Sequence, residues 1–416
     1  MKFPLLAVIL AIILLIPHSI DAKERKTHAM SLTVFKVIEE ANLLVEEGDT
    51  TQAIEIIQLA IKKRTSKYEK AQLYTLLGSI YYRNSDEANA FSSFARVLES
   101  AGGMPLMLHQ QTLKTLSQLS MVKEDYESAR GYCVQLIEIS EDKNQLDYAL
   151  LTQANYKLED WEQALIAAAA GLDVATQQQK APDENLLLLL NAVHYEMKAM
   201  SKMVGVLELL IKHYPKKTYI LYLASVYGQL DQLDKQTVVM ESLYEDGRIK
   251  EGSQLRNLAS LYMSEKVPYK SALLLEKAIK EGVLDANKQN YEMLSQAWQL
   301  AAHKDESIRA LAEAAKLSDN GKNYLKKAYL HFDDSNWAES EKALYQAFDK
   351  GLKENFEGEA WLLLGMTRFN MKDFDEAIEA CEKAKKFKKS TKFAVQWIRY
   401  ISTEKDKYNM LKAAAM

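Results

Sequence analysis

The sequence contains few of the residues that interrupt helices or cross-link chains. Its 416 residues include two cysteines, six prolines and 15 glycines. Two cysteines are too few for a disulfide-rich scaffold. Because glycine and proline are scarce while Ala, Leu, Glu and Lys are abundant, the composition favours helix along most of the chain.

A strong charge of either sign is also absent. The chain has 53 basic and 57 acidic residues, which give a net charge of −4. A dedicated nucleic-acid-binding protein needs a basic face, so we expect no nucleic-acid partner. Hydrophobic residues make up 48% of the chain, which is enough to build a core and argues against global disorder.

The one long apolar run lies at the N-terminus. Lys2 precedes 12 consecutive apolar residues at positions 5–16, and Ala22 offers a small residue before a charged segment. This layout is typical of a secretory signal peptide, and the run is shorter than the roughly 20 apolar residues of a membrane span. We expect cleavage after Ala22 and a periplasmic protein; an uncleaved inner-membrane anchor is the alternative.

A pattern recurs along the rest of the chain. The stretches "YKLEDWEQALIAAAAGLDVA", "HFDDSNWAESEKALYQA" and "FNMKDFDEAIEACEKA" each contain a polar turn, an aromatic residue, a small residue three positions later and an apolar helix. Ten units follow, separated by 33 to 39 residues. They start at Val37, Tyr74, Leu113, Tyr148, Leu187, Ile220, Leu255, Tyr291, Tyr324 and Trp361.

This skeleton resembles the tetratricopeptide repeat (TPR), a helix pair with a 34-residue period. The resemblance implies an all-α fold, a right-handed superhelical solenoid of about ten TPR-like helix pairs with a C-terminal capping helix. We assign residues 1–22 to the signal peptide, 23–33 to a polar segment, 34–390 to the solenoid, and 391–416 to the capping helix and tail. The seventh and eighth units are the weakest, since Ala272 and Ala278 stand six residues apart where seven are expected and Pro268 falls in the turn.

Packing explains the small residues of the pattern. Gly78 and Gly365 stand where the two helices of a pair approach each other, and Ala90 and Ala377 face them from the second helix. We expect the capping helix to bury Phe393, Trp397 and Ile401. Cys133 and Cys381 occupy the same repeat position in units three and ten, too far apart to form a disulfide.

No motif for chemistry emerges. The seven histidines include no pair at metal-ligand spacing, and there is no Gly-rich phosphate loop or Gly-x-Ser-x-Gly elbow. His331, near Asp333 and Asp334, is interpreted as the end of a helix. We therefore expect no catalytic residue, no metal, no cofactor and no enzymatic activity.

A solenoid offers the concave surface of its first helices for binding. The residues expected to line it are aromatic or polar and uncharged: Tyr82, Gln118, Tyr156, Tyr195, Tyr222, Asn257, Tyr329, Phe332 and Phe369. Tyrosine is enriched at binding hot spots, although each of these residues could instead pack between helices. A basic docking patch is the second candidate, formed by Lys385, Lys386, Lys388, Lys389, Lys392 and Trp397.

Across its length, including the "AVQWIRYI" helix, the chain is similar to the exported TPR proteins associated with TonB–ExbB–ExbD energy-transduction systems. That resemblance implies an accessory of the uptake of iron complexes through the outer membrane, with TonB, ExbB or ExbD as partners and at most peripheral membrane contact. Two alternatives remain open. One is a scaffold for polysaccharide export, outer-membrane assembly or division, and the other is a cell-envelope hydrolase.

Overall fold

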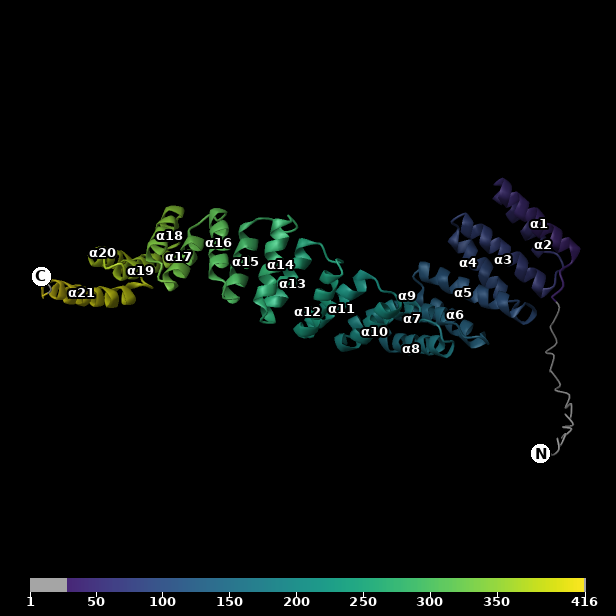
Figure 1. Cartoon of the computed structure of the whole chain (residues 1–416). Coiled ribbons are helices and arrows are strands. Elements are labelled where there is room, and N and C mark those ends of the chain that lie inside the picture. Colours follow the sequence, from purple (N-terminus) through teal and green to yellow (C-terminus); the bar gives the residue numbers. More distant parts are fainter. Residues whose placement is uncertain (1–27, 415–416) are drawn as a thin grey trace, which may run out of the picture. The chain divides into compact units, whose positions relative to one another are not determined.

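The fold is described by a computed structural model covering residues 28–414, so the expected signal peptide lies outside the described residues. Within that range the backbone forms 21 α-helices, one 3₁₀ turn (η1, Ala101–Gly103) and no strand (Figure 1). None of these helices combines the length and the hydrophobicity needed to span a bilayer.

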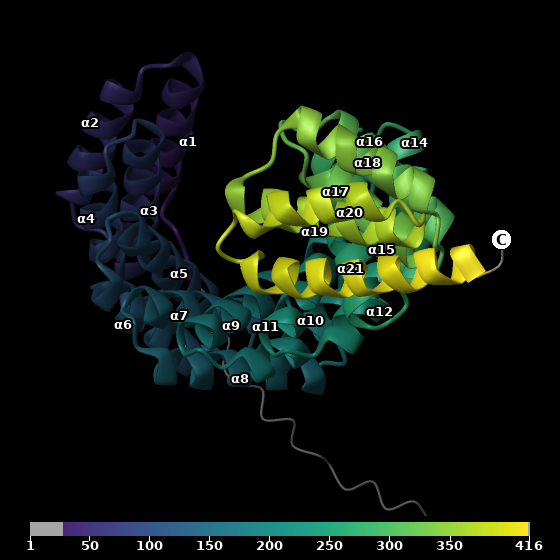
Figure 2. The same ribbon diagram turned by 90° about the vertical axis from the view of Figure 1, so that its left-hand side faces the viewer.

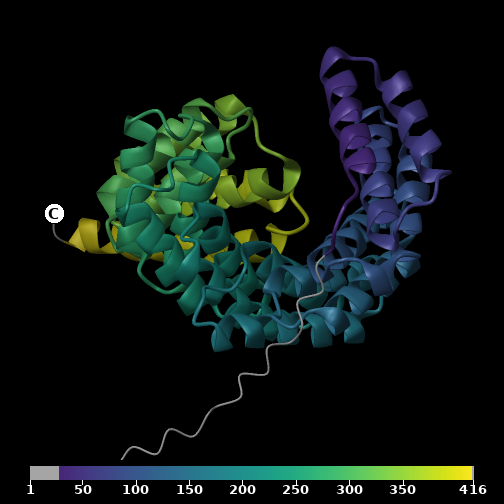
Figure 3. The same cartoon turned by 90° about the vertical axis from the view of Figure 1, so that its right-hand side faces the viewer.

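The helices divide between two compact units, residues 1–193 and 194–416. In the first unit, neighbouring helices form antiparallel pairs, each laid alongside the next (Figure 3). The pairs are α1 (Leu32–Glu47) with α2 (Thr50–Ile61), α3 (Lys67–Arg83) with α4 (Glu87–Leu98), α5 (Leu106–Val122) with α6 (Tyr126–Ile139), and α7 (Gln145–Lys157) with α8 (Trp161–Gln177).

The boundary between the units falls within α9 (Glu184–Glu196). The second unit continues with α10 (Met200–His213), and then with the pairs α11 (Lys217–Gln229) and α12 (Leu233–Glu245), α13 (Gly252–Ser264) and α14 (Pro268–Lys280), α15 (Lys288–Leu300) and α16 (Lys304–Lys316), α17 (Lys322–Asp333) and α18 (Trp337–Lys350), and α19 (Glu354–Asn370) and α20 (Phe374–Lys385). In chain order α1 to α20 make ten successive pairs. Contacts join the helices of the four pairs before α9 and of the five pairs after α10, which confirms the predicted solenoid of TPR-like pairs.

The short acidic turn of the pattern caps the second helix of a pair. Asp160 stands before α8, and its carboxylate accepts a hydrogen bond from the backbone N–H of Gln163 at 3.2 Å. Asp86 and Asp125 do the same before α4 and α6. An N-cap carboxylate satisfies one of the N–H groups that a helix leaves without a backbone partner.

The residue before that cap has left-handed backbone geometry in every pair. Its φ lies between 56° and 91° at Gly48, Ser85, Glu124, Glu159, Lys198, Asp231, Lys266, Ala302, Ser335 and Lys372. Only the first pair has glycine there. The other nine pairs adopt a conformation that disfavours a Cβ atom, because it brings Cβ close to the following carbonyl.

Ala302→Gly is therefore expected to raise the free energy of unfolding by about 1 kcal/mol, since Ala302 has a φ of 61°. Urea denaturation measures the change. The matched control is Ala338→Gly on the exposed side of α18, which should lower stability by about 1 kcal/mol because that residue is helical. Equal losses in the two variants would contradict the left-handed turn.

The seventh pair corrects one detail of the sequence analysis. The small residue that faces α13 is Ser271, which is fully buried and donates a hydrogen bond to the carbonyl of Ala259 at 2.8 Å. Counting from Ser271 restores the seven-residue spacing to Ala278. Pro268 is the first residue of α14, where a missing N–H does no harm, and does not lie in the turn.

The same serine contact recurs in the next two pairs. Ser307 donates to the carbonyl of Ser295 at 2.9 Å, and Ser340 donates to that of Ala328 at 3.0 Å. A serine can replace the usual alanine because its hydroxyl fits the close contact and finds an acceptor there. Units seven to nine are therefore regular, although their sequences look irregular.

Glu69 fastens the first two pairs together. Its carboxylate accepts hydrogen bonds from the backbone N–H groups of Ser31 at 2.8 Å and Ser66 at 2.7 Å, at the N-termini of α1 and α3. Hydrogen bonding by Ser31 and Ser66 lowers the pKa of Glu69 to about 2. The charged form is the one that the fold stabilises.

Stability should consequently fall as the pH drops from the ordinary glutamate pKa of 4.5 toward about 2, because protonation of Glu69 is then coupled to unfolding. In Glu69→Gln this part of the pH dependence should be lost. Thermal melts of both proteins between these pH values provide the test, and parallel pH profiles would contradict a special role for Glu69.

The last helix, α21 (Thr391–Ala414), packs on α20 and α19 (Figure 2). Ala394 and Ile401 are its fully buried residues, and Trp397 is half-buried. The prediction that Phe393 is buried was wrong, because it stands about 100° around the helix from Ala394 and is 55% exposed.

Candidate functional site

Grooves lie between successive first helices of the solenoid. The groove between α3 and α5 has a volume of about 410 Å³, and it contains Tyr82 and Gln118 over a floor of Phe94 and Leu119. Both predicted residues are exposed. Val122, one helical turn after Gln118, also lines this groove, and the helical period could have identified it from the sequence.

A second groove lies between α11 and α13 and has a volume of about 310 Å³. Asn257 and Ser225 line it with the amide groups of Gln236 and Gln254, above Met240. Tyr222 is exposed on α11 and is not part of its lining. The polar residues of this lining are uncharged.

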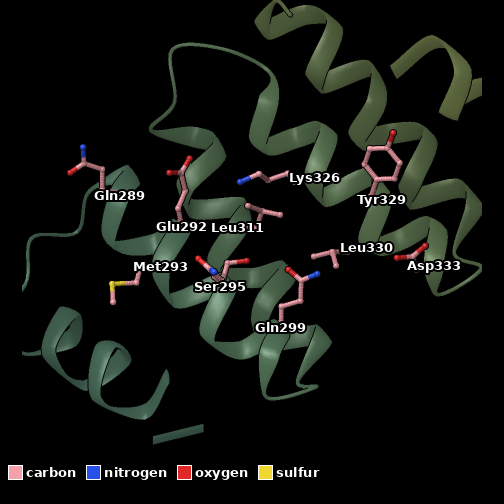
Figure 4. Close-up of a pocket in the computed structure, with 11 residues that line it drawn as sticks. Gln289, Glu292, Met293, Ser295, Gln299, Leu311, Lys326, Tyr329, Leu330 and Asp333 are labelled. Carbon is pink, nitrogen blue, oxygen red and sulfur yellow. The ribbon is translucent and has the colours of Figure 1, made fainter. Parts of the chain in front are cut away.

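The largest of these grooves lies between α15 and α17 and has a volume of about 670 Å³. Figure 4 shows Gln299 on α15 and Tyr329 and Asp333 on α17 among its lining residues. Desolvation raises the pKa of the Tyr329 hydroxyl, so this group remains a hydrogen-bond donor over the physiological range.

Charged residues also line this third groove, which the sequence analysis did not anticipate. Glu292 accepts a hydrogen bond from the side-chain amide of Asn323 at 2.8 Å, and Lys326 lines the groove from α17. Lys326 stands one helical turn before Tyr329, a predicted lining residue on the same face. The repeat register could therefore have identified Lys326, although the lining was expected to be aromatic or uncharged.

Three aromatic residues of the predicted surface pack against the aromatic that begins the next helix. The ring centroids of Tyr156 and Trp161 are 5.3 Å apart, those of Phe332 and Trp337 5.0 Å, and those of Phe369 and Phe374 5.9 Å. In each pair the rings meet edge to face. Such contacts stabilise a fold, so part of each of these rings packs at the turn of its own hairpin and is not available to a partner.

Tyr82 and Tyr195 stand at the same repeat position but lack this partner. The residue five places later is Glu87 for Tyr82 and Met200 for Tyr195, and the two tyrosines are 55% and 49% exposed. All three tyrosines were expected to line the concave surface, and Tyr156 is less exposed than Tyr82 and Tyr195. The residue five places on decides which tyrosine stays exposed.

Phe332→Ala should lower the free energy of unfolding by about 3 kcal/mol, since it removes a partly buried aromatic and its contact with Trp337. Tyr82→Ala, at the same repeat position but exposed, should stay within about 0.5 kcal/mol of the parent. Thermal and urea denaturation measure both. Equal effects would contradict the rule drawn from the fifth residue.

Phe369 belongs to the capped end of the solenoid. Its ring lies 5.8 Å from that of Trp397 and 5.3 Å from that of Tyr400, both on α21. The capping helix thus covers one side of Phe369, and it also engages Trp397, which the sequence analysis assigned to the basic patch. Neither residue presents a fully exposed ring.

The lysines of the basic patch are exposed around the end of α20 and the start of α21. Lys385 forms an ion pair with Glu382 at 3.1 Å. The other four have no carboxylate within ion-pair distance among the described residues; they are Lys386, Lys388, Lys389 and Lys392. This end of the second unit therefore carries unbalanced positive charge.

The two cysteines are free, buried and held as thiols. Burial raises the pKa of Cys133 to about 11 and that of Cys381 to about 12. A thiol of this kind is a poor nucleophile, because the thiolate is the reactive form. Across residues 28–414 no three His, Cys, Asp or Glu side chains gather in a way that could hold a metal ion.

These features define the class of the protein as a helical-repeat scaffold whose first helices enclose shallow grooves. Two segments identify the repeat. Residues 38–105 and residues 358–391 each match a family described as "Tetratricopeptide repeat". The chain therefore contains tetratricopeptide repeats, and a protein-binding scaffold is consistent with them.

Solved structures resemble the chain in fold. The MamA protein is 19% identical over 41% of this chain and 91% of its own, with a TM-score of 0.35. A Naa15/Naa10 complex bound to HypK-THB is 14% identical over 91% and 61%, with a TM-score of 0.44. The TPR2AB domain of yeast Sti1 in complex with pHSP90 is 11% identical over 64% and 98%, with a TM-score of 0.36. Among curated proteins, a sequence search finds no match.

Proposed function

We propose that the protein is an exported scaffold that binds a partner protein in the grooves between its first helices. One observation carries this proposal: the grooves between α3 and α5, α11 and α13, and α15 and α17 combine exposed polar or aromatic side chains with an apolar floor. Interfaces between proteins have this composition, with tyrosine enriched at their centres.

The lining suits a segment of polypeptide in particular. The side chains of Gln118 and Asn257 carry both donors and acceptors, so each can bond to a peptide group. Phe94 and Leu119 beneath Tyr82 offer an apolar surface to a side chain of the partner. A peptide segment can supply both the backbone hydrogen bonds and the apolar side chain that such a groove accommodates.

Site-specific photocrosslinking tests this proposal. A photoreactive amino acid placed at Tyr82 or Tyr329, in the living cell, should yield the same covalently linked partner protein. The matched control position is Tyr269 on α14, a second helix, which is comparably exposed but outside these grooves. Equal crosslinking from all three positions would argue against groove-specific binding.

Export is the second part of the proposal, and the apolar run and Ala22 support it. N-terminal sequencing of the protein isolated from its native compartment should give Lys23 as the first residue. Recovery of a protein that retains Met1 in a membrane fraction would show that the segment is not cleaved and that it anchors the scaffold.

For the partner we propose a component of a TonB–ExbB–ExbD system, on the strength of the whole-chain resemblance. The crosslinked partner should then be TonB, ExbB or ExbD, and deleting the gene for this protein should slow growth on iron complexes. If the crosslinked partner is instead a protein of polysaccharide export, outer-membrane assembly or division, the result would favour an envelope-assembly scaffold.

A further inference from the structure

The N-terminal end of the solenoid leaves one repeat position uncovered. The position compared lies six residues after the residue that starts each repeat unit, for example Ile80 in the unit that starts at Tyr74. In units two to ten the side chain at this position is at most 7% exposed, as at Ile80, Leu119 and Val226. In α1 the same position is Leu43, which is 55% exposed. Ile80 and Leu119 belong to core clusters with residues of the preceding helix pair, so the corresponding side of α1 is a stacking face that no described residue covers.

The surroundings of Leu43 are apolar and acidic. Leu32 and Phe35 are exposed on the same helix. The sequence of α1 contains four glutamates and one lysine, and no ion pair joins the glutamates to another described residue. This acidic face therefore combines an apolar strip with unbalanced negative charge.

The C-terminal end shows the complementary feature. Val395 follows Trp361 by 34 residues, and Ala394 and Ile401 are buried against the preceding pair, so α21 takes the place of a first helix. Arg399 stands where other first helices carry a small residue facing their own second helix, and it is exposed. No described helix covers this side of α21.

The open side of α21 is apolar and basic. Phe393 and Tyr400 are exposed beside it. The helix contains five basic and two acidic residues. Lys405 pairs with Asp375 and Lys407 pairs with Glu404, whereas Lys392 and Arg399 pair with no carboxylate among the described residues. The unpaired lysines between α20 and α21 add to this basic face.

We propose that the basic face of α21 in one copy of the chain packs on the acidic face of α1 in a second copy. Each face is an open stacking surface of the same repeat, and their charges are opposite. A contact between two α1 faces, or between two α21 faces, would bring like charges together, which electrostatic repulsion disfavours. The contact is therefore head to tail and can continue from copy to copy.

Sedimentation velocity of the full chain over a range of concentrations tests the proposal. The sedimentation coefficient should rise with concentration, and the rise should shrink in high salt because exposed charges are screened. Two variants isolate the faces: Glu39→Lys with Leu43→Lys on α1, and Lys392→Glu with Arg399→Glu on α21. All four residues are exposed, so unchanged far-UV circular dichroism is expected for both variants.

Each variant alone should be monomeric, because every head-to-tail contact needs one intact face of each kind. An equimolar mixture should regain association, since the intact α21 face of the first variant meets the intact α1 face of the second. Self-association of either variant alone would overturn the proposal in favour of a like-end contact.

A parent chain that stays monomeric at every concentration would also overturn the proposal. If that monomer binds phosphatidylglycerol vesicles through Lys392 and Arg399, the basic face serves an anionic membrane surface instead.

Discussion

Replacing Gly365 with leucine is expected to lower the free energy of unfolding by about 3 kcal/mol. A Cβ atom at this position would lie against the sulfur of Cys381 and 3.0 Å from the carbonyl oxygen of Ala377, both on the facing helix α20. Backbone cannot give way as a flexible side chain can, so α19 and α20 would have to separate. Urea denaturation with circular dichroism measures the loss.

Gly131 on α6 provides the matched control, because a Cβ atom there would meet nothing within 4 Å. Gly131→Ala should gain about 0.5–1 kcal/mol, as expected for an exposed helical glycine. Gly365→Ala should already be destabilising, and adding Cys381→Ala should recover part of that loss by removing the sulfur. A Gly365→Leu variant as stable as the parent would show that α19 and α20 do not touch here.

Loss of partner affinity by about 30-fold is the second large effect we expect, from Tyr82→Ser. This corresponds to a hot spot of about 2 kcal/mol. Tyr82 is exposed over the floor of the α3–α5 groove, and its truncation removes a large contact area at little cost to the fold. Isothermal titration with the partner identified by crosslinking gives the affinity.

Tyr269→Ser is the control for this measurement, since Tyr269 lies on a second helix and is comparably exposed. It should leave the affinity unchanged. If Tyr82→Ser also binds like the parent, the partner occupies another groove, and the same substitution at Tyr329 locates it.

The sequence predicted the helix pairs because their signal is repeated. A turn, an aromatic and a small residue recur at a nearly constant interval, so a weak unit such as the seventh is supported by its neighbours. In the seventh unit Ala272 was expected at the small-residue position, which Ser271 occupies. What the position demands is a side chain small enough for the helix contact, and the carbonyl of Ala259 makes serine suitable.

The binding surface was harder to predict, because exposure depends on contacts that the repeat does not encode. Tyr82 and Tyr156 share a repeat position, but only Tyr156 finds a tryptophan five residues later. Phe393 has the hydrophobicity of a buried residue yet is 55% exposed, whereas Ala394 beside it is fully buried. Periodicity defines the face of a helix to within about one residue, and that difference separates a core side chain from an exposed one.

The left-handed turn at Ala302 bears on the order in which the chain folds. A helix hairpin closes through residues near one another in sequence, so such contacts form early in proteins dominated by local structure. If the α15–α16 hairpin is complete in the transition state, the strain at Ala302 is present there as well. Relief of that strain by glycine then accelerates folding and leaves the unfolding rate almost unchanged. In the same way, each of the nine non-glycine turns would limit the rate at which its own helix hairpin forms.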